Sequence, residues 1–144
     1  MAGKKLTCLD CAQVNRVPEE RLSEAKCGTC GAKLVLQKAV EIVFATLQKA
    51  ARNDELPLVV DFWAPWCGPC KMMGPEFNKA ADVLAGRARL VKVNTEAEPK
   101  AGQAYAIRGI PTMVRFEGGK EKKRQSGAMR AGDIQKLHMR ERRQ

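Results

Sequence analysis

The chain has 144 residues, of which 44% are hydrophobic and 29% are charged, and its net charge is +10. A chain of this size and composition buries one substantial core plus a small module, so we expect one domain with an extension rather than a large multidomain enzyme. No apolar run approaches the roughly 20 residues that span a bilayer. No apolar segment follows Lys4 and Lys5, so the sequence predicts a cytoplasmic protein without signal peptide or membrane contact.

The excess of positive charge lies at the two ends of the chain. Residues 1–40 carry a net charge of +3, residues 41–114 carry +1 and residues 115–144 carry +6. The basic clusters at 120–124 and 140–143 are interpreted as a solvated hairpin and a solvated helix end, with binding of an anionic partner as the alternative.

Two Cys-x-x-Cys pairs, Cys8/Cys11 and Cys27/Cys30, stand in the first part of the chain. Their spacing, C-x2-C-x15-C-x2-C, is typical of zinc sites, because two tight turns brought together complete a tetrahedral shell of four sulfurs. The segment has few core residues, so metal binding must supply much of its folding free energy. The sequence therefore predicts a zinc ribbon of short strands over residues 1–36, with one structural zinc ion.

Other interpretations of this segment remain open. The four cysteines could instead form two disulfides or remain free thiols, although in the reducing setting expected here cysteines are more often metal ligands or catalysts. The ribbon could also dock nucleic acid or protein through its lysines and arginines. No aromatic residue interleaves with those basic residues to stack on bases, so nucleic acid is not an expected partner.

The rest of the chain alternates between strand and helix patterns. We expect strands at residues 39–43, 58–63, 88–94, 112–116 and 121–125, and helices at 46–52, from Cys70 to Gly86, at 99–105 and at 131–143. Residues 58–63 are apolar on both faces, as in a central strand covered by helices. Pro75 should kink the second helix. This order predicts an α/β domain over residues 39–144, with one mixed sheet and helices on both faces.

A third pair, Cys67 and Cys70, lies at a strand-to-helix junction and indicates a dithiol redox centre. Cys67 would stand at the helix N-terminus, where unpaired N–H groups and the helix dipole favour the thiolate. An inert disulfide or half of a metal site is the alternative. Asp61 lies on an apolar strand, so its pKa should be raised by burial and it can accept the proton that Cys70 loses. The alternative for Asp61 is a hydrogen-bonded structural carboxylate.

Residues 61–71 (DFWAPWCGPCK), 91–94 (VKVN) and 108–112 (RGIPT) together resemble the thioredoxin family. The four-cysteine extension resembles the bacterial, zinc-ribbon-containing thioredoxin 2 branch of that family. The resemblance covers essentially the whole chain and implies the thioredoxin fold and protein-disulfide reductase activity without a bound organic cofactor. It implies disulfide-containing proteins as substrates and an NADPH-linked thioredoxin reductase as electron donor, and we expect a monomer.

The resemblance also implies roles for single residues. Cys67, the better exposed of its pair, is the nucleophile and Cys70 the resolving thiol, while Lys92 modulates Asp61. Pro111 matches the family's cis-proline, which leaves the backbone of Ile110 free to pair with an extended substrate. The substrate groove is implied to consist of Trp66, Gly68, Pro69, Gly109, Ile110, Pro111 and Gly127, whereas Trp63 is expected to be buried beneath it.

Two other functions stay open at this point. A disulfide oxidase or isomerase belongs to the same enzyme class, although the Gly-Pro dipeptide between the cysteines resembles the reducing branch. A zinc-ribbon binding or redox-sensor module could instead use the thioredoxin fold as a scaffold.

A few conspicuous residues outside the motifs also carry expectations. Met72 and Met73 are expected to pack, and His138 is expected on a solvated face. Arg115 interrupts an apolar strand, and the last helix has only Ile134 and Leu137 as clearly apolar residues. These two features leave open how firmly that helix docks.

Overall fold

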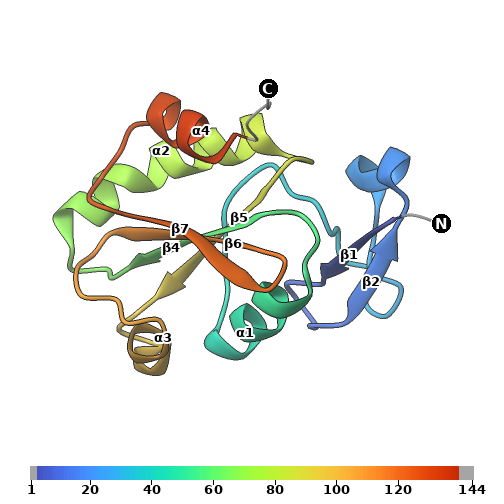
Figure 1. Cartoon of the computed structure of the whole chain (residues 1–144), viewed down its shortest axis with the longest axis horizontal. Coiled ribbons are helices and arrows are strands. Elements are labelled where there is room, and N and C mark those ends of the chain that lie inside the picture. The colour runs from blue at the N-terminus through green and yellow to red at the C-terminus, as the bar shows by residue number, and fades with distance from the viewer. Residues whose placement is uncertain (1–2, 140–144) are drawn as a thin grey trace.

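The computed structural model describes residues 3–139, which form a two-stranded and a five-stranded sheet (Figure 1). In the smaller sheet, β1 (Lys4–Thr7) pairs antiparallel with β2 (Val14–Val17), and a short 3-10 helix, η1 (Glu19–Glu24), follows. The expected ribbon of short strands is therefore present. No helix within residues 3–139 is long and apolar enough to cross a membrane.

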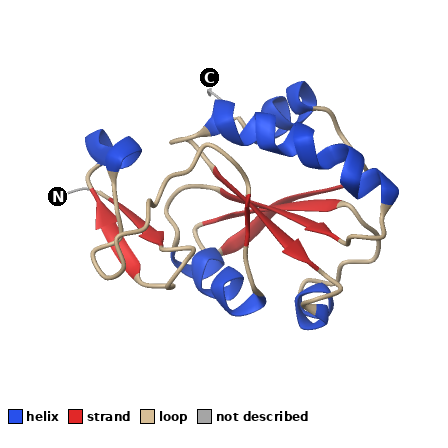
Figure 2. Cartoon of the chain, turned by 180° about the vertical axis from the view of Figure 1, so that it is seen from behind, coloured by secondary structure: helices blue, strands red, loops and turns tan. Residues whose placement is uncertain are grey.

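The larger sheet has the strand order β3-β5-β4-β6-β7. Its strands are β3 (Val40–Glu41), β4 (Leu58–Trp63), β5 (Arg89–Asn94), β6 (Thr112–Glu117) and β7 (Lys120–Ser126), and its helices are α1 (Phe44–Asn53), α2 (Gly68–Leu84), α3 (Pro99–Ala104) and α4 (Ala131–His138). Strands β3, β5 and β4 run parallel, and β6 and β7 are antiparallel additions. Helices α2 and α4 cover one face and α1 and α3 the other (Figures 1 and 2), which confirms the predicted mixed sheet.

The central strand β4 has core on both of its faces. Val60 and Phe62 pack in the apolar cluster that includes α1, whereas Val59 packs with Phe77 of α2. Successive side chains of a strand point to opposite faces, so Asp61 lies on the α2 face with Val59. It is the only charged residue of β4 and is completely buried.

Boundaries differ from the prediction mainly at β3 and α4. Strand β3 has only two residues, because Ala39 N–H bonds to the Asn78 side chain instead of a strand and Val43 already caps α1. Helix α4 ends at His138, and residues 140–143 of the predicted helix lie outside the described residues. Pro75 lies within one continuous helix α2.

The expectation of a solvated His138 is wrong, because this side chain is buried at the end of α4. Arg115 Nη1 lies 3.5 Å from His138 Nδ1 and donates to Leu137 O at 2.9 Å. Burial lowers the pKa of His138 to about 4, and the nearby charges of Arg115 and Lys123 act in the same direction. Arg115 thus docks the end of α4 onto the sheet instead of weakening the contact.

A buried ion pair joins the ribbon to the larger sheet. Arg89 Nη1 lies 2.6 Å from Asp54 Oδ2, and both side chains are almost inaccessible, at 4% and 2% exposure. The guanidinium also donates to two ribbon carbonyls, Thr7 O at 2.9 Å and Leu34 O at 2.8 Å, while Thr7 N–H donates to Asp54 Oδ1 at 2.7 Å. Leu56, two residues after Asp54, packs in the apolar cluster of the ribbon. The two sheets are therefore packed together.

Candidate functional site

The four ribbon cysteines converge on one point. Their Sγ atoms all lie within 4.8 Å of one another, with 3.6 Å between Cys8 and Cys30 and 3.6 Å between Cys11 and Cys27. A tetrahedral site with metal–sulfur bonds of about 2.3 Å separates its sulfurs by about 3.8 Å. The sulfurs therefore have the spacing of a four-thiolate metal site.

The backbone forms the same turn at both pairs. Ala12 N–H donates to Cys8 O at 2.9 Å, and Gly31 N–H donates to Cys27 O at 2.9 Å. The residue closing each turn has a positive φ, 69° at Ala12 and 80° at Gly31. A glycine is suited to this conformation, whereas Ala12 adopts it at a steric cost.

Backbone N–H groups point at the first sulfur of each pair. Asp10 N and Cys11 N each lie 3.4 Å from Cys8 Sγ, and Thr29 N lies 3.3 Å from Cys27 Sγ. Donors aimed at a sulfur favour its charged form. Together with the spacing of the sulfurs, this arrangement makes the four cysteines a metal-binding site, in which each would act as a thiolate ligand.

Cys67 and Cys70 form a disulfide at the start of α2. Cys67 is the N-cap of that helix, and Cys70 N–H points at Cys67 Sγ at 3.2 Å. Exposure is 5% for Cys67 and 2% for Cys70, so both are buried and the expected difference is small. Within residues 3–139, the only group of three or more cysteine, histidine or carboxylate side chains able to hold a metal is the ribbon cluster. This pair is therefore separate from the metal site.

Of the expected groove residues, Ile110 lies against Cys67, and Pro111 and Gly127 adjoin Ile110. The peptide bond between Ile110 and Pro111 is cis, and Ile110 O lies 3.8 Å from Cys67 Sγ. Gly127 N–H donates to Pro111 O at 2.8 Å, which ties the segment before α4 to this loop. The other expected groove residues, Trp66, Gly68, Pro69 and Gly109, are all exposed, the first three beside the dithiol and the last beside Ile110.

Asp61 is buried without a hydrogen-bond partner at either carboxylate oxygen among the described residues. Burial raises its pKa to about 7, with a smaller contribution in the same direction from Glu41. Lys92, its neighbour in register on β5, opposes this rise. The apolar strand thus correctly predicted a desolvated acid.

Sequence reasoning missed Glu41. On β3 it lies in register with Lys92, and its carboxylate accepts hydrogen bonds from Trp63 Nε1 at 3.0 Å and from Asn94 N at 2.8 Å. Burial raises the pKa of Glu41, and these two hydrogen bonds oppose the rise. The prediction of a buried Trp63 is wrong, because its ring is only half-buried and reaches Glu41. The available signal was that Glu41 is the one charge in its predicted strand.

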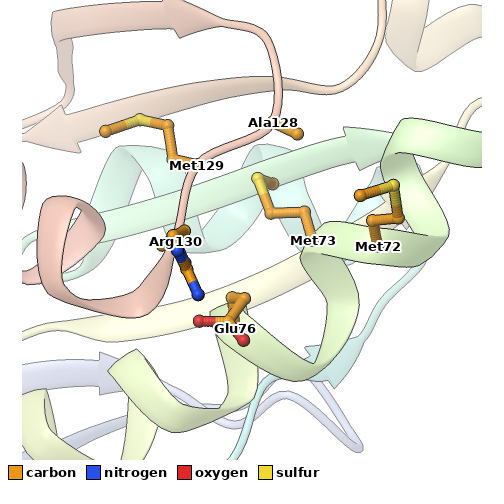
Figure 3. A pocket seen from close by; sticks show the side chains of 6 residues that line it. All are labelled: Met72, Met73, Glu76, Ala128, Met129 and Arg130. Atoms are coloured by element: carbon orange, nitrogen blue, oxygen red, sulfur yellow. The ribbon is translucent and has the colours of Figure 1, made fainter.

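A cavity of about 420 Å³ lies between α2 and the segment before α4 (Figure 3). It is lined by Met72, Met73, Glu76, Ala128, Met129 and Arg130. Met73 is buried in the core as expected, whereas Met72 is exposed. Glu76 Oε1 accepts a hydrogen bond from Ala131 N at 2.8 Å, so one wall of the cavity also holds the start of α4.

Comparison with known proteins decides the family. Residues 38–140 match the family model described as Thioredoxin, and residues 7–32 match the one described as Thioredoxin 2, N-terminal. The chain belongs to the thioredoxin family. It is a thiol–disulfide oxidoreductase of that family with a Cys67/Cys70 redox pair, and its N-terminal cysteine cluster fits the zinc ribbon of thioredoxin 2.

Relatives in sequence and structure agree with this membership. Thioredoxin C-3 of Corynebacterium nephridii is 38% identical over 131 residues, which cover 90% of each chain. Thioredoxin 1 of Chlorobaculum tepidum is 44% identical over 84 residues, or 58% of this chain and 83% of the relative. The structure of chloroplastic thioredoxin z, 30% identical, matches 69% of this chain and 90% of its own with a TM-score of 0.64. The thioredoxin of Malassezia sympodialis, 32% identical, matches 69% of this chain and 88% of its own with a TM-score of 0.62.

Proposed function

We propose that this thioredoxin reduces protein disulfides through attack by Cys67 and resolution by Cys70. The observation that carries the proposal is a dithiol at a helix N-terminus, with a carboxyl buried without partners on the strand that leads to it. In the reduced protein, the Cys67 thiolate attacks a substrate disulfide, forms a mixed disulfide and releases one substrate thiolate. Cys70 loses its proton and attacks Cys67 Sγ, which releases the second substrate thiolate and leaves the Cys67–Cys70 disulfide.

The position of Cys67 supports its role as nucleophile. As the N-cap of α2 it lies at the positive end of the helix dipole, and Cys70 N–H points at its sulfur. Both features stabilise a thiolate over a thiol. Cys70, one turn into the helix, lies on the same side and can reach Cys67 in the resolving step.

Asp61 is proposed to take up the proton of Cys70. An acid whose pKa lies near the working pH exchanges protons most effectively, and burial places the pKa of Asp61 at about 7. Lys92, in register beside it, modulates that value by favouring the ionised carboxylate. A carboxylate already paired with a cation would be a weaker base.

The substrate is proposed to lie as an extended chain across the exposed surface around Cys67. Trp66, Gly68 and Pro69 border it on one side, and the loop of Gly109, Ile110 and Pro111 with Gly127 borders it on the other. Contact with backbone groups of this loop would give affinity with little side-chain specificity. This suits a reductase that acts on many disulfide-containing proteins.

The ribbon is proposed to hold one structural zinc ion through Cys8, Cys11, Cys27 and Cys30. A closed tetrahedral shell of four thiolates is typical of structural zinc, and the sulfur spacing fits it. When bound, zinc would crosslink the two turns and stabilise the fold. We also propose a division into residues 1–36 and 39–144, a cytoplasmic monomer, and reduction by an NADPH-linked thioredoxin reductase.

An insulin-reduction assay with thioredoxin reductase and NADPH tests this function. We expect turnover by the wild type, none by Cys67→Ser, and turnover close to wild type for Lys79→Met, an exposed position on the same helix. Absence of turnover in the wild type would refute the reductase proposal. Metal analysis with thiol titration of the reduced protein should give one zinc and two readily titratable thiols; six titratable thiols without metal would refute the zinc site.

A further inference from the structure

We propose that Glu41 is a positioning residue for proton transfer at Asp61. It holds Lys92 and Trp63 away from the Asp61 carboxylate. The inference rests on the proposed role of Asp61 as proton acceptor. It concerns a residue that no motif of the dithiol includes.

The strand register places Lys92 between two carboxylates. Lys92 is in register with Glu41 on β3 and with Asp61 on β4. Residues in register on adjacent strands point to the same face of the sheet, and neighbouring strands lie about 4.8 Å apart. Lys92 therefore has a carboxylate on each side, and the two carboxylates are separated by roughly two strand spacings, or 10 Å.

The carboxylate of Glu41 is fixed by two donors. Trp63 Nε1 donates to one oxygen at 3.0 Å and Asn94 N to the other at 2.8 Å. Lys92 Nζ lies 4.5 Å from the centre of the Trp63 ring, in cation–π contact. Glu41 thus orients the ring on which the ammonium group rests and supplies negative charge on the same side.

Asp61 is left without a partner by this arrangement. None of the ion pairs among the described residues includes Lys92, and both oxygens of Asp61 lack hydrogen bonds. Without the charge of Glu41, Lys92 would favour an ionised Asp61 more strongly, and Asp61 would become a weaker proton acceptor.

Other charged groups also face this cluster. Asp61 faces Lys92 and Glu41 and lies on the α2 face of the sheet, below the dithiol helix. Glu41 faces Lys92, and together with Glu98 and Asp10 of the ribbon it lines a cavity of about 410 Å³. Glu98 and Asp10 are present in wild type and in every variant described next, so a difference between their Asp61 midpoints reports on Glu41.

Carboxyl NMR titration of the oxidised full-length protein tests the inference, because the dithiol does not titrate in that state. In Glu41→Gln, which keeps an oxygen acceptor but loses the charge, the midpoint of Asp61 should fall by about one pH unit. Glu41→Ala, which also loses the hydrogen bonds, should give at least that fall together with a shifted Trp63 indole resonance. Asp82→Asn removes an exposed carboxylate on α2 and should leave the midpoint unchanged.

An Asp61 midpoint in Glu41→Gln equal to that of Asp82→Asn would overturn the inference. A native NMR spectrum of Glu41→Gln shows that this variant is folded, so the test holds even if Glu41→Ala does not fold. The pH profile of insulin reduction supplies the second measurement, since its acid limb should move to lower pH in Glu41→Gln. If Asp61→Asn leaves that limb in place, the proposed proton transfer fails, while the NMR midpoint still decides whether Glu41 controls Asp61.

Discussion

Replacement of Arg89 by methionine should destabilise the whole chain through the contact between the ribbon and the larger sheet. The variant leaves the buried Asp54 carboxylate with only the Thr7 N–H, and it leaves Thr7 O and Leu34 O without their donor. Removal of one member of a buried ion pair typically costs about 3–5 kcal/mol. This is a large part of the roughly 5–15 kcal/mol that stabilises a typical domain.

Urea unfolding of the metal-loaded protein measures this cost. Arg89→Met should lower the free energy of unfolding by the amount above, and it should speed metal loss to a chelator because Thr7 precedes the ligand Cys8. Lys79→Met is the control, since its ion pair with Glu76 is long, at 3.4 Å, and exposed, at 66% and 27%. Exposed pairs contribute about 0–1 kcal/mol.

A double-mutant cycle with Asp54→Asn separates the ion pair from the carbonyl contacts. The two substitutions should be strongly non-additive, because each single variant leaves a buried charge without its counter-charge. A loss below 1 kcal/mol in Arg89→Met, with metal release as slow as in Lys79→Met, would refute the claim that this pair holds the ribbon in place.

Three further predictions concern pH and metal. The pKa of Asp61 is raised from 3.8 to about 7, so the folded wild type loses stability as pH rises across this window. In urea unfolding, Asp61→Asn should therefore be more stable than wild type by roughly 4 kcal/mol above pH 7 and equally stable below pH 4. The pKa of His138 is lowered from 6.5 to about 4, so wild type should lose up to roughly 3 kcal/mol as pH falls through this window, whereas His138→Gln should not. Chelation of the metal should unfold the ribbon while the near-UV signal of the larger domain persists, because that domain has its own two apolar clusters.

Each of these has a distinct contradicting result. Equal pH dependence of unfolding in wild type and Asp61→Asn would mean that the carboxyl is not desolvated. An unchanged slope between pH 4 and 6.5 in His138→Gln would place the histidine in solvent. Coincident loss of all circular dichroism on chelation would show that the two parts unfold as one.

The sequence predicted the parts of the fold that local patterns encode. Residues 58–63 have apolar side chains on both faces and became the central strand β4 with those same bounds. The cysteine spacing predicted the four-sulfur cluster, because each tight turn is determined within a few residues. Asp61 was identified as a buried acid because its strand neighbours are all apolar.

The features that were missed depend on strand order and on distant partners. Arg89 and Asp54 are 35 residues apart, and nothing near either in the sequence indicates that they pair in the interior. The role of Glu41 depends on the pairing of β3 with β5, which brings Glu41 next to Lys92. For Arg115, a charge within an apolar strand left the docking of α4 open, whereas the structure supplies it with an acceptor on that helix, Leu137 O.

The three Cys-x-x-Cys pairs show why the local motif alone does not distinguish metal binding from redox chemistry. Cys11 N–H points at Cys8 Sγ at 3.4 Å, and Cys70 N–H points at Cys67 Sγ at 3.2 Å, so both turns aim a backbone donor at the sulfur of the first cysteine. The difference lies in what faces the sulfurs. Cys8 faces a second pair at 3.6 Å, whereas Cys67 faces Ile110 O at 3.8 Å. Four sulfurs that meet complete a metal shell, and a pair that meets no other sulfur is left to exchange disulfides.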